Sequence, residues 1–345
     1  ETNFSLHSVC EFILARAIVD DFEVQTRFVE IAGDVSATAA VAMNVDGERI
    51  MIRTRDADEI EILIGNGWVF VDEANSNEVV DLYDGGYVSV SGRTVTVRGS
   101  EGELVEVTLM GFTGGDPIGY VRVSVPAARA GKLEGLLGDF DGDSSNDFRT
   151  QSGQVLVQPT LAELHTVFAE SWRIQPSESL FHYEPGESTY TYSDPQAPRT
   201  YLSVADLDPA DLQYAEMVCT NAGITIPELF ENCAFDVAVT GNPAWAEIAA
   251  AIDPTVAGLT VSPQFARIRG VDDVVPLTLL LRGASLADVR WEASRGSVVG
   301  SGLEVEFHPP VDGEFGEVYT VTAFLESNPG VRKDILVIFH WCCAS

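Results

Sequence analysis

The sequence contains very little positive charge. Lysine occurs only at Lys132 and Lys333, and 20 basic residues stand against 53 acidic ones, for a formal net charge of −33. Nucleic acids and anionic membrane surfaces are bound through basic patches that contact phosphate groups. The composition therefore excludes nucleic acid as a partner and favours cations. An alternative is that the charge serves only to keep the protein soluble.

Long apolar runs are also lacking. A membrane-spanning helix needs at least about 18 consecutive apolar residues, and the apolar segment 12–15 is interrupted by Arg16 and then by Asp20 and Asp21. We therefore expect no membrane insertion. A hydrophobic fraction of 46% is nevertheless too high for a disordered chain, and 345 residues favour two or three domains over one.

Patterns of catalytic residues are absent from the sequence. The five histidines (His7, His165, His182, His308 and His340) are scattered, without the short spacings of a metal site. There is no Gly-x-Ser-x-Gly nucleophile motif and no glycine-rich phosphate loop before a helix. We therefore predict that the protein is not an enzyme.

Cysteines are few, and none forms a Cys-x-x-Cys pair, which argues against a zinc ribbon. Cys219 and Cys233 flank a short helical stretch, and a disulfide closing a loop of this size would contribute about 3 kcal/mol. The odd total of five leaves at least one thiol unpaired or joined to another chain. Five free thiols in a reducing compartment remain an alternative.

Short segments of strand character dominate both ends of the chain. Residues 22–28, 39–45 and 94–98 are examples from the first part, with turn signals such as Asp46-Gly47 between strands. Residues 258–340 repeat this pattern at the size of a small sandwich. Helical patterns occupy residues 161–172 and 204–251. We predict a mainly β fold with a small helical subdomain, divided into residues 1–175, 176–253 and 254–345.

A dense acidic segment lies within residues 138–148. Four aspartates and one asparagine occur within nine residues, and such carboxylates repel one another unless a cation lies between them. Calcium takes six to eight oxygen ligands, and alternating aspartates with Gly142 at the bend suit a loop around it. The glycine position and the lack of a closing glutamate differ from an EF-hand. A solvated acidic turn is the alternative. The predicted ligands are Asp139, Asp141, Asp143, Asn146, Asp147 and the carbonyl of Ser145.

The segment Gly135–Asp143, followed by Asn146–Phe148, resembles the signature of the von Willebrand factor type D family. Further similar stretches occur in the family's order at residues 9–14, 21–25, 168–173 and 233–241. The resemblance as a whole therefore extends over roughly residues 1–252. The segment at residues 179–183 resembles a Ser-Leu-Phe-x-Tyr run found in bacterial members of this family. The resemblance implies a β-sandwich with calcium as its cofactor, in an extracellular or cell-surface protein.

The resemblance also bears on the cysteines. Cys219 and Cys233 occupy the family's positions in a helical subdomain, which implies a disulfide between them, and Cys10 is expected to pair with Cys342, with Cys343 or with another chain. The two cysteines of the family signature are replaced here by Glu134 and Leu137. This replacement puts in doubt the family's usual disulfides and any thiol exchange.

The C-terminal part resembles bacterial immunoglobulin-like domains, on the residues 289–292, 296–302 and 319–323, with Trp291 expected to fill the core.

Together the resemblances imply a secreted structural or adhesive protein, such as a repeating subunit of an extracellular filament. Its partners would be other protein subunits, including copies of itself, or surface glycans. The alternative function is a glycan- or ligand-binding module, with Tyr190, Tyr192 and Tyr201 as candidate contacts.

Overall fold

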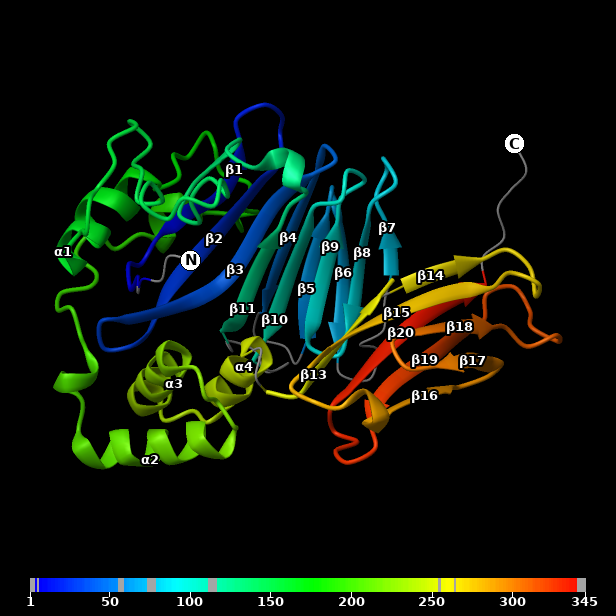
Figure 1. Cartoon of the computed structure of the whole chain (residues 1–345). Helices are drawn as coiled ribbons and strands as arrows, with labels where there is room; N and C mark the ends of the chain where they lie inside the picture. The colour runs from blue at the N-terminus through cyan, green and yellow to red at the C-terminus, as the bar shows by residue number, and fades with distance from the viewer. Residues whose placement is uncertain are drawn as a thin grey trace. The chain divides into compact units, whose positions relative to one another are not determined.

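The computed structural model describes residues 4, 6–54, 59–72, 79–110, 117–253, 256–263 and 265–339 (Figure 1). In these residues, more residues lie in β-strands than in helices, which confirms the mainly β fold. The chain forms two compact units. Unit 1 comprises residues 1–215 and 234–248, and unit 2 comprises residues 216–233 and 249–345. The three-part division expected from the sequence remains a prediction.

Unit 1 is built on one large antiparallel β-structure that divides into two sheets. One path has the order β12-β1-β2-β3-β11-β10-β9-β8-β7, and a branch leaves β3 in the order β3-β4-β5-β6. The division occurs along one edge of β3, where Thr38 pairs with Ile118 of β11 and residues 40–45 pair with β4. The bounds are β1 Glu11–Ala17, β2 Glu23–Ala32, β3 Val35–Val45, β4 Glu48–Thr54, β5 Glu59–Ile64, β6 Gly67–Asp72, β7 Val79–Asp81, β8 Tyr87–Ser91, β9 Thr94–Arg98, β10 Leu104–Leu109, β11 Ile118–Ser124 and β12 Leu133–Glu134.

The sequence patterns account for these strands. Val95 and Val97 of β9 are buried, whereas Arg98 at its end is exposed, as expected at the edge of a buried strand. Asp46 and Gly47 both have positive φ, 53° and 73°, which is the backbone that a two-residue hairpin turn requires. Inward-facing side chains of both sheets form one continuous apolar core.

The helices lie between the two sets of strands in the sequence. Their bounds are α1 Leu161–Glu163, which continues as a π-helical segment Leu164–Ala169, then α2 Pro209–Asn221, α3 Pro227–Thr240 and α4 Ala244–Ile252. Three of them start at or next to a proline (Pro209, Pro227 and Pro243), because proline suits the first turn of a helix. Within the described residues, no helix combines the length and apolar character needed to cross a bilayer.

Unit 2 contains two four-stranded sheets with the orders β13-β15-β18-β17 and β14-β20-β19-β16. Phe307 and Tyr319 lie at the centre of its core. The expectation that Trp291 fills this core was wrong. Its side chain is only half-buried, and its indole N–H donates to Gly302 O at 3.1 Å, so it covers the edge of the core. The bounds are β13 Gly258–Ser262, β14 Phe265–Ile268, β15 Val275–Arg282, β16 Val289–Ala293, β17 Ser297–Ser301, β18 Glu304–His308, β19 Val318–Leu325 and β20 Arg332–Phe339.

Candidate metal site

The acidic loop, residues 138–148, leaves the edge of the unit 1 sheet. Strand β12 pairs with β1, and the chain then follows β1 further, because Leu136 N donates to Ile13 O at 3.1 Å and Leu137 N to Leu14 O at 3.0 Å. Gly131 N also donates to Asp139 O at 2.9 Å. The start of the loop is therefore fixed to a buried strand on one side and to its own preceding turn on the other.

Two glycines are required at the start of this loop. Gly135 has φ +136°, and a β-carbon there would lie 2.5 Å from Leu14 O. Gly138 has φ +76°, and a β-carbon there would lie 2.6 Å from Asp147 Oδ1. Any other residue would be strained and would push the loop away from β1 or from Asp147. The spacing of the two glycines in the sequence motif thus has a direct steric cause.

The far end of the loop is anchored by the motif at residues 168–172. Phe148 packs edge to face against Phe168, with ring centroids 5.4 Å apart. The buried Trp172 donates its indole N–H to Arg149 O at 3.0 Å, and Ser171 Oγ accepts from Gln151 N at 3.2 Å. The resemblance of this motif to the family therefore corresponds to a structural role, which is to hold the return of the acidic loop.

Inside the loop, alternate carboxylates accept hydrogen bonds from backbone N–H groups two residues ahead. Asp139 Oδ1 accepts from Asp141 N at 3.2 Å, Asp141 Oδ1 from Asp143 N at 2.6 Å, and Asp143 Oδ1 from Ser145 N at 3.0 Å. The Asp143 N–H and the Asn146 amide hold the pKa of the Asp141 carboxyl below its ordinary value. Asp139, Asp141 and Asp143 are therefore held on one ordered turn, and the hydrogen bonds to Asp141 favour the ionised form of its carboxyl.

The oxygen atoms of this turn do not form a finished metal cluster. Within the described ranges, no three His, Cys, Asp or Glu side chains converge closely enough to hold a metal ion as they stand. Asn146 provides a different signal. Its Nδ2 donates to Asp141 Oδ2 at 3.0 Å, whereas its Oδ1 is buried and has no hydrogen-bond partner among the residues that the structure describes. A buried oxygen without a donor is costly, and a cation would satisfy it, so the donor set of the loop suits a hard metal ion.

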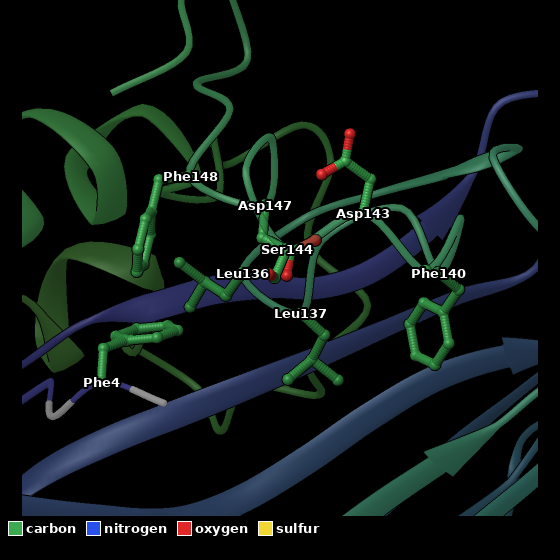
Figure 2. Close-up of a pocket in the computed structure, with 9 residues that line it drawn as sticks. Phe4, Leu136, Leu137, Phe140, Asp143, Ser144, Asp147 and Phe148 are labelled. Carbon is green, nitrogen blue, oxygen red and sulfur yellow. The ribbon is translucent and has the colours of Figure 1, made fainter. Parts of the chain in front are cut away.

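Two cavities lie beside the loop, and Asp147 lines both of them. One has a volume of about 320 Å³ and is walled mainly by apolar side chains, including Leu136, Leu137 and Phe140 (Figure 2). The other, of about 300 Å³, is lined by Asp139, Asn146 and Asp147 together with Arg149 and residues of the β1–β12 edge. The second cavity therefore contains three of the predicted ligand residues.

The cysteines fall into three groups. Cys219 and Cys233 form a disulfide, as the sequence predicted. Cys10 is a buried thiol that is free within the described residues, and burial raises its pKa. Cys342 and Cys343 lie outside the described residues, so the pairing expected for Cys10 remains a prediction.

A salt bridge occupies one position where the family signature has a cysteine. Glu134 Oε1 lies 2.6 Å from Arg16 Nη2 and accepts from Arg16 Nε at 3.0 Å. This ion pair joins β12 to β1 next to the acidic loop. The second replacement, Leu137, is partly exposed. In this chain, an ion pair at Glu134 therefore ties the loop to the sheet edge where the signature would have a cysteine.

Sequence reasoning missed a buried ion pair in unit 1. Glu11 Oε1 lies 2.7 Å from Arg27 Nη2, and both side chains are almost completely buried. Tyr183 donates its hydroxyl to Glu11 Oε2 at 2.5 Å, and burial, followed by this hydrogen bond, raises the pKa of Tyr183 to about 12. The sequence did contain a signal for this pair, because Glu11 and Arg27 are charged residues at inward positions of two apolar strands, and such residues are rarely buried without a partner.

The tyrosines considered as sugar contacts do not form one surface. The Arg27 guanidinium lies 3.5 Å from the ring centroid of Tyr192, so this ring packs internally. Tyr201 packs against His165 with ring centroids 5.0 Å apart. Tyr190 is 75% exposed. Only Tyr190 of these three therefore presents most of its side chain to solvent, and an aromatic platform for a sugar ring is not formed by this set.

Comparison with known proteins identifies a matching family model and related proteins. Residues 1–154 match the family model of the von Willebrand factor type D domain. Sushi domain-containing protein 2 of Homo sapiens is 23% identical over 251 residues, covering 70% of this chain and 29% of that protein. SCO-spondin of Bos taurus is 29% identical over 170 residues, covering 48% of this chain and 3% of that protein. The chain thus spans only a minor part of each relative.

These matches support the type D resemblance for the part that contains the strands of unit 1 and the acidic loop. They do not support the bacterial type, nor the immunoglobulin-like assignment of the C-terminal part.

Proposed function

We propose that this chain, which carries a von Willebrand factor type D domain over residues 1–154, is a calcium-binding structural or adhesive part of an extracellular protein. The type D family consists of non-enzymatic extracellular domains, and the proposed role is likewise binding and assembly without catalysis. The disulfide between Cys219 and Cys233 supports an oxidising compartment. Its partners in the proposal are other protein subunits.

The observation that carries the calcium proposal is the acidic loop with the unpartnered, buried Oδ1 of Asn146. Asp139, Asp141, Asp143, Asn146, Asp147 and the Ser145 carbonyl are the proposed ligands. Asp141 and Asp143 are exposed, so their carboxylates can leave the backbone N–H groups that they now accept from. Calcium tolerates irregular geometry with six to eight oxygens, whereas magnesium demands a compact octahedron. The loop therefore fits calcium better than magnesium.

We also propose that the strands of unit 2 form an immunoglobulin-like module. Support comes from the strand orders β13-β15-β18-β17 and β14-β20-β19-β16. If β14 is counted as an additional strand, the first sheet holds the first, second, fifth and fourth of the remaining seven strands, as in an immunoglobulin constant-type sandwich, and the second sheet holds the other three. Such a module would serve as a spacer or contact domain in the assembly.

Calcium titration of the metal-free full chain tests the main proposal. Calcium at about a hundredfold excess over Kd is expected to stabilise the native state by about 2.7 kcal/mol, which differential scanning calorimetry with and without chelator would measure. Asp141→Asn removes a central charged ligand and is expected to abolish most of this gain. Magnesium at the same concentration is expected to give a smaller gain.

The matched control is Asp84→Asn, which removes a carboxylate from an exposed turn of unit 1 outside the acidic loop. This variant should retain the full calcium response. The proposal fails if calcium leaves the melting temperature of verified metal-free protein unchanged, or if the Asp84 and Asp141 variants respond alike.

A further inference from the structure

The apolar cavity of about 320 Å³ beside the acidic loop has a buried floor and an exposed lip. Its floor includes Leu136, which is 3% exposed, and Phe148, whose ring packs edge to face against Phe4 at 5.5 Å between centroids. Its lip includes Leu137 and Phe140, which are 42% and 37% exposed. Neighbouring apolar side chains that remain accessible around a hollow are typical of a binding surface.

Phe140 is held in an unusual backbone conformation. Its φ is +61°, a left-handed value that costs a residue with a β-carbon about 1–2 kcal/mol. Glycine would adopt this φ without that cost. Because the ring is also partly exposed, local burial offers little compensation. The position therefore places an aromatic ring at the mouth of the cavity at an energetic cost, and such strain is often found where a ligand is bound.

The polar part of the cavity lining is acidic. Asp143, Ser144 and Asp147 line it, and none of the described lining residues is basic. In Figure 2, Leu137 and Phe140 lie below the loop backbone, whereas the Asp143 carboxylate points upward. The four aspartates of the loop have a formal charge of −4, and one bound Ca²⁺ would leave −2. A net charge of −33 for the chain disfavours a second copy as the occupant.

We propose that this cavity binds one large apolar side chain of a partner protein segment that carries basic residues on either side of it, and that calcium in the acidic loop holds the cavity in shape. The second clause rests on the proposed function. The cavity volume lies at the lower end of the range for ligand sites, about 300–1,000 Å³, so it suits one side chain better than a larger ligand. The acidic rim selects the flanking charge.

Calcium and the partner segment are coupled because they use the same short stretch of chain. Asp143 and Asp147 are proposed metal ligands and also line the cavity. Phe140 and Phe148 are each adjacent in sequence to a proposed ligand. When the carboxylates close on a cation, the positions of these two neighbouring rings are therefore fixed as well. By linkage, calcium then raises the affinity for the segment, and the segment raises the affinity for calcium by the same factor.

Blocked tripeptides test this proposal on the full chain, with titrations followed by NMR. The sequence Lys-Trp-Lys should bind in calcium, whereas Lys-Gly-Lys and Glu-Trp-Glu should each bind at least about tenfold more weakly. Leu137→Asp should weaken Lys-Trp-Lys binding by about tenfold or more, since it places a charge in the apolar lip. The control Tyr83→Asp changes a side chain that is 90% exposed and outside the cavity, and should bind as the wild type does.

Phe140→Gly separates binding from folding. It relieves the positive φ, so the thermal stability should be unchanged or higher, while removal of the ring should weaken Lys-Trp-Lys binding. Equal binding by wild type, Leu137→Asp and Phe140→Gly would overturn the cavity proposal.

The coupling between calcium and the peptide has a separate outcome. If calorimetry shows that calcium binds but the peptide affinity is the same with chelator, the coupling is wrong and the proposal that the cavity binds the peptide is supported. If calcium does not bind and the peptide does, the proposed calcium-binding function is wrong and the proposal that the cavity binds the peptide is again supported.

Discussion

His165 connects the N-terminal segment of unit 1 to the π-helical turn. Its Nε2 accepts from His7 N at 3.0 Å, and its Nδ1 lies 2.8 Å from Leu161 O, so the ring is neutral with the proton on Nδ1. Burial lowers the pKa of both His165 and His7, and the proximity of His165 lowers that of His7 further. The folded state therefore resists protonation at two neighbouring rings.

We expect acidification to weaken the folded state through these histidines. Their folded pKa values lie below the unfolded value of about 6.5, so their penalty is absent above that pH and grows as the pH falls below it. His165→Gln keeps an acceptor for His7 N but cannot become charged. Urea unfolding at pH 7.5 and pH 5 should show a smaller loss of unfolding free energy in this variant than in the wild type.

Asp236 provides a control of opposite sign. Desolvation raises the pKa of its carboxyl to about 7, so its destabilising effect is full above that pH and disappears as the pH falls toward the unfolded value. Asp236→Asn should therefore gain more stability at pH 7.5 than at pH 5. If the pH dependence of wild type and His165→Gln is identical, the histidine explanation is wrong.

At the residue scale, the sequence identified the composition of the candidate site better than its internal contacts. The density of aspartates and the positions of the glycines were visible directly, because all of them lie in one short segment. The unpartnered Oδ1 of Asn146 and the buried pair of Glu11 and Arg27 were not visible in the sequence. Both depend on how segments distant in the sequence pack together, and that packing has no local signature.

At the element scale, the short connection between α2 and α3 is held in two ways within unit 2. Cys219 and Cys233 form a disulfide 14 residues apart in sequence. The buried Asp253 accepts from Thr225 N at 2.9 Å and from Ile226 N at 3.3 Å, just before α3 begins. Asp253, the last residue of the predicted part 176–253, thus caps the start of a helix.

Removing the disulfide should lower the free energy of unfolding by about 3 kcal/mol, because an open loop of this length gains conformational freedom in the unfolded state. Urea denaturation of Cys219→Ser/Cys233→Ser against wild type measures this loss. Reductant should destabilise the wild type to the same extent and leave the double variant unchanged. An equal effect of reductant on both proteins would show that another thiol is responsible.

For the whole molecule, strand periodicity and turn residues were sufficient to predict a mainly β fold with a few helices. The division of the chain into two units was harder to predict from the sequence. Residues 234–248 belong with unit 1, whereas residues 216–233, which precede them, belong with unit 2. Helical periodicity alone cannot reveal this, because it identifies an apolar face without specifying the surface that the face contacts.

The pairing of β14 with β20 in unit 2 has a mechanical consequence. These strands are parallel, with Phe265 opposite Leu336 and Ile268 opposite Phe339. Tension applied to the N-terminal side of β14 and the C-terminal side of β20 pulls the two strands past each other, so all hydrogen bonds of the ladder bear the load together. An antiparallel hairpin pulled from its open end would instead separate one bond at a time.

Single-molecule pulling across unit 2 of the full chain should therefore show a distinct force peak. Ala266→Pro, which disturbs the loaded ladder, should lower that force, whereas Val299→Pro in the edge strand β17 should change it less. Equal effects of the two substitutions would contradict this. A shear-loaded ladder of this kind would let unit 2 transmit tension along the proposed extracellular assembly while remaining folded.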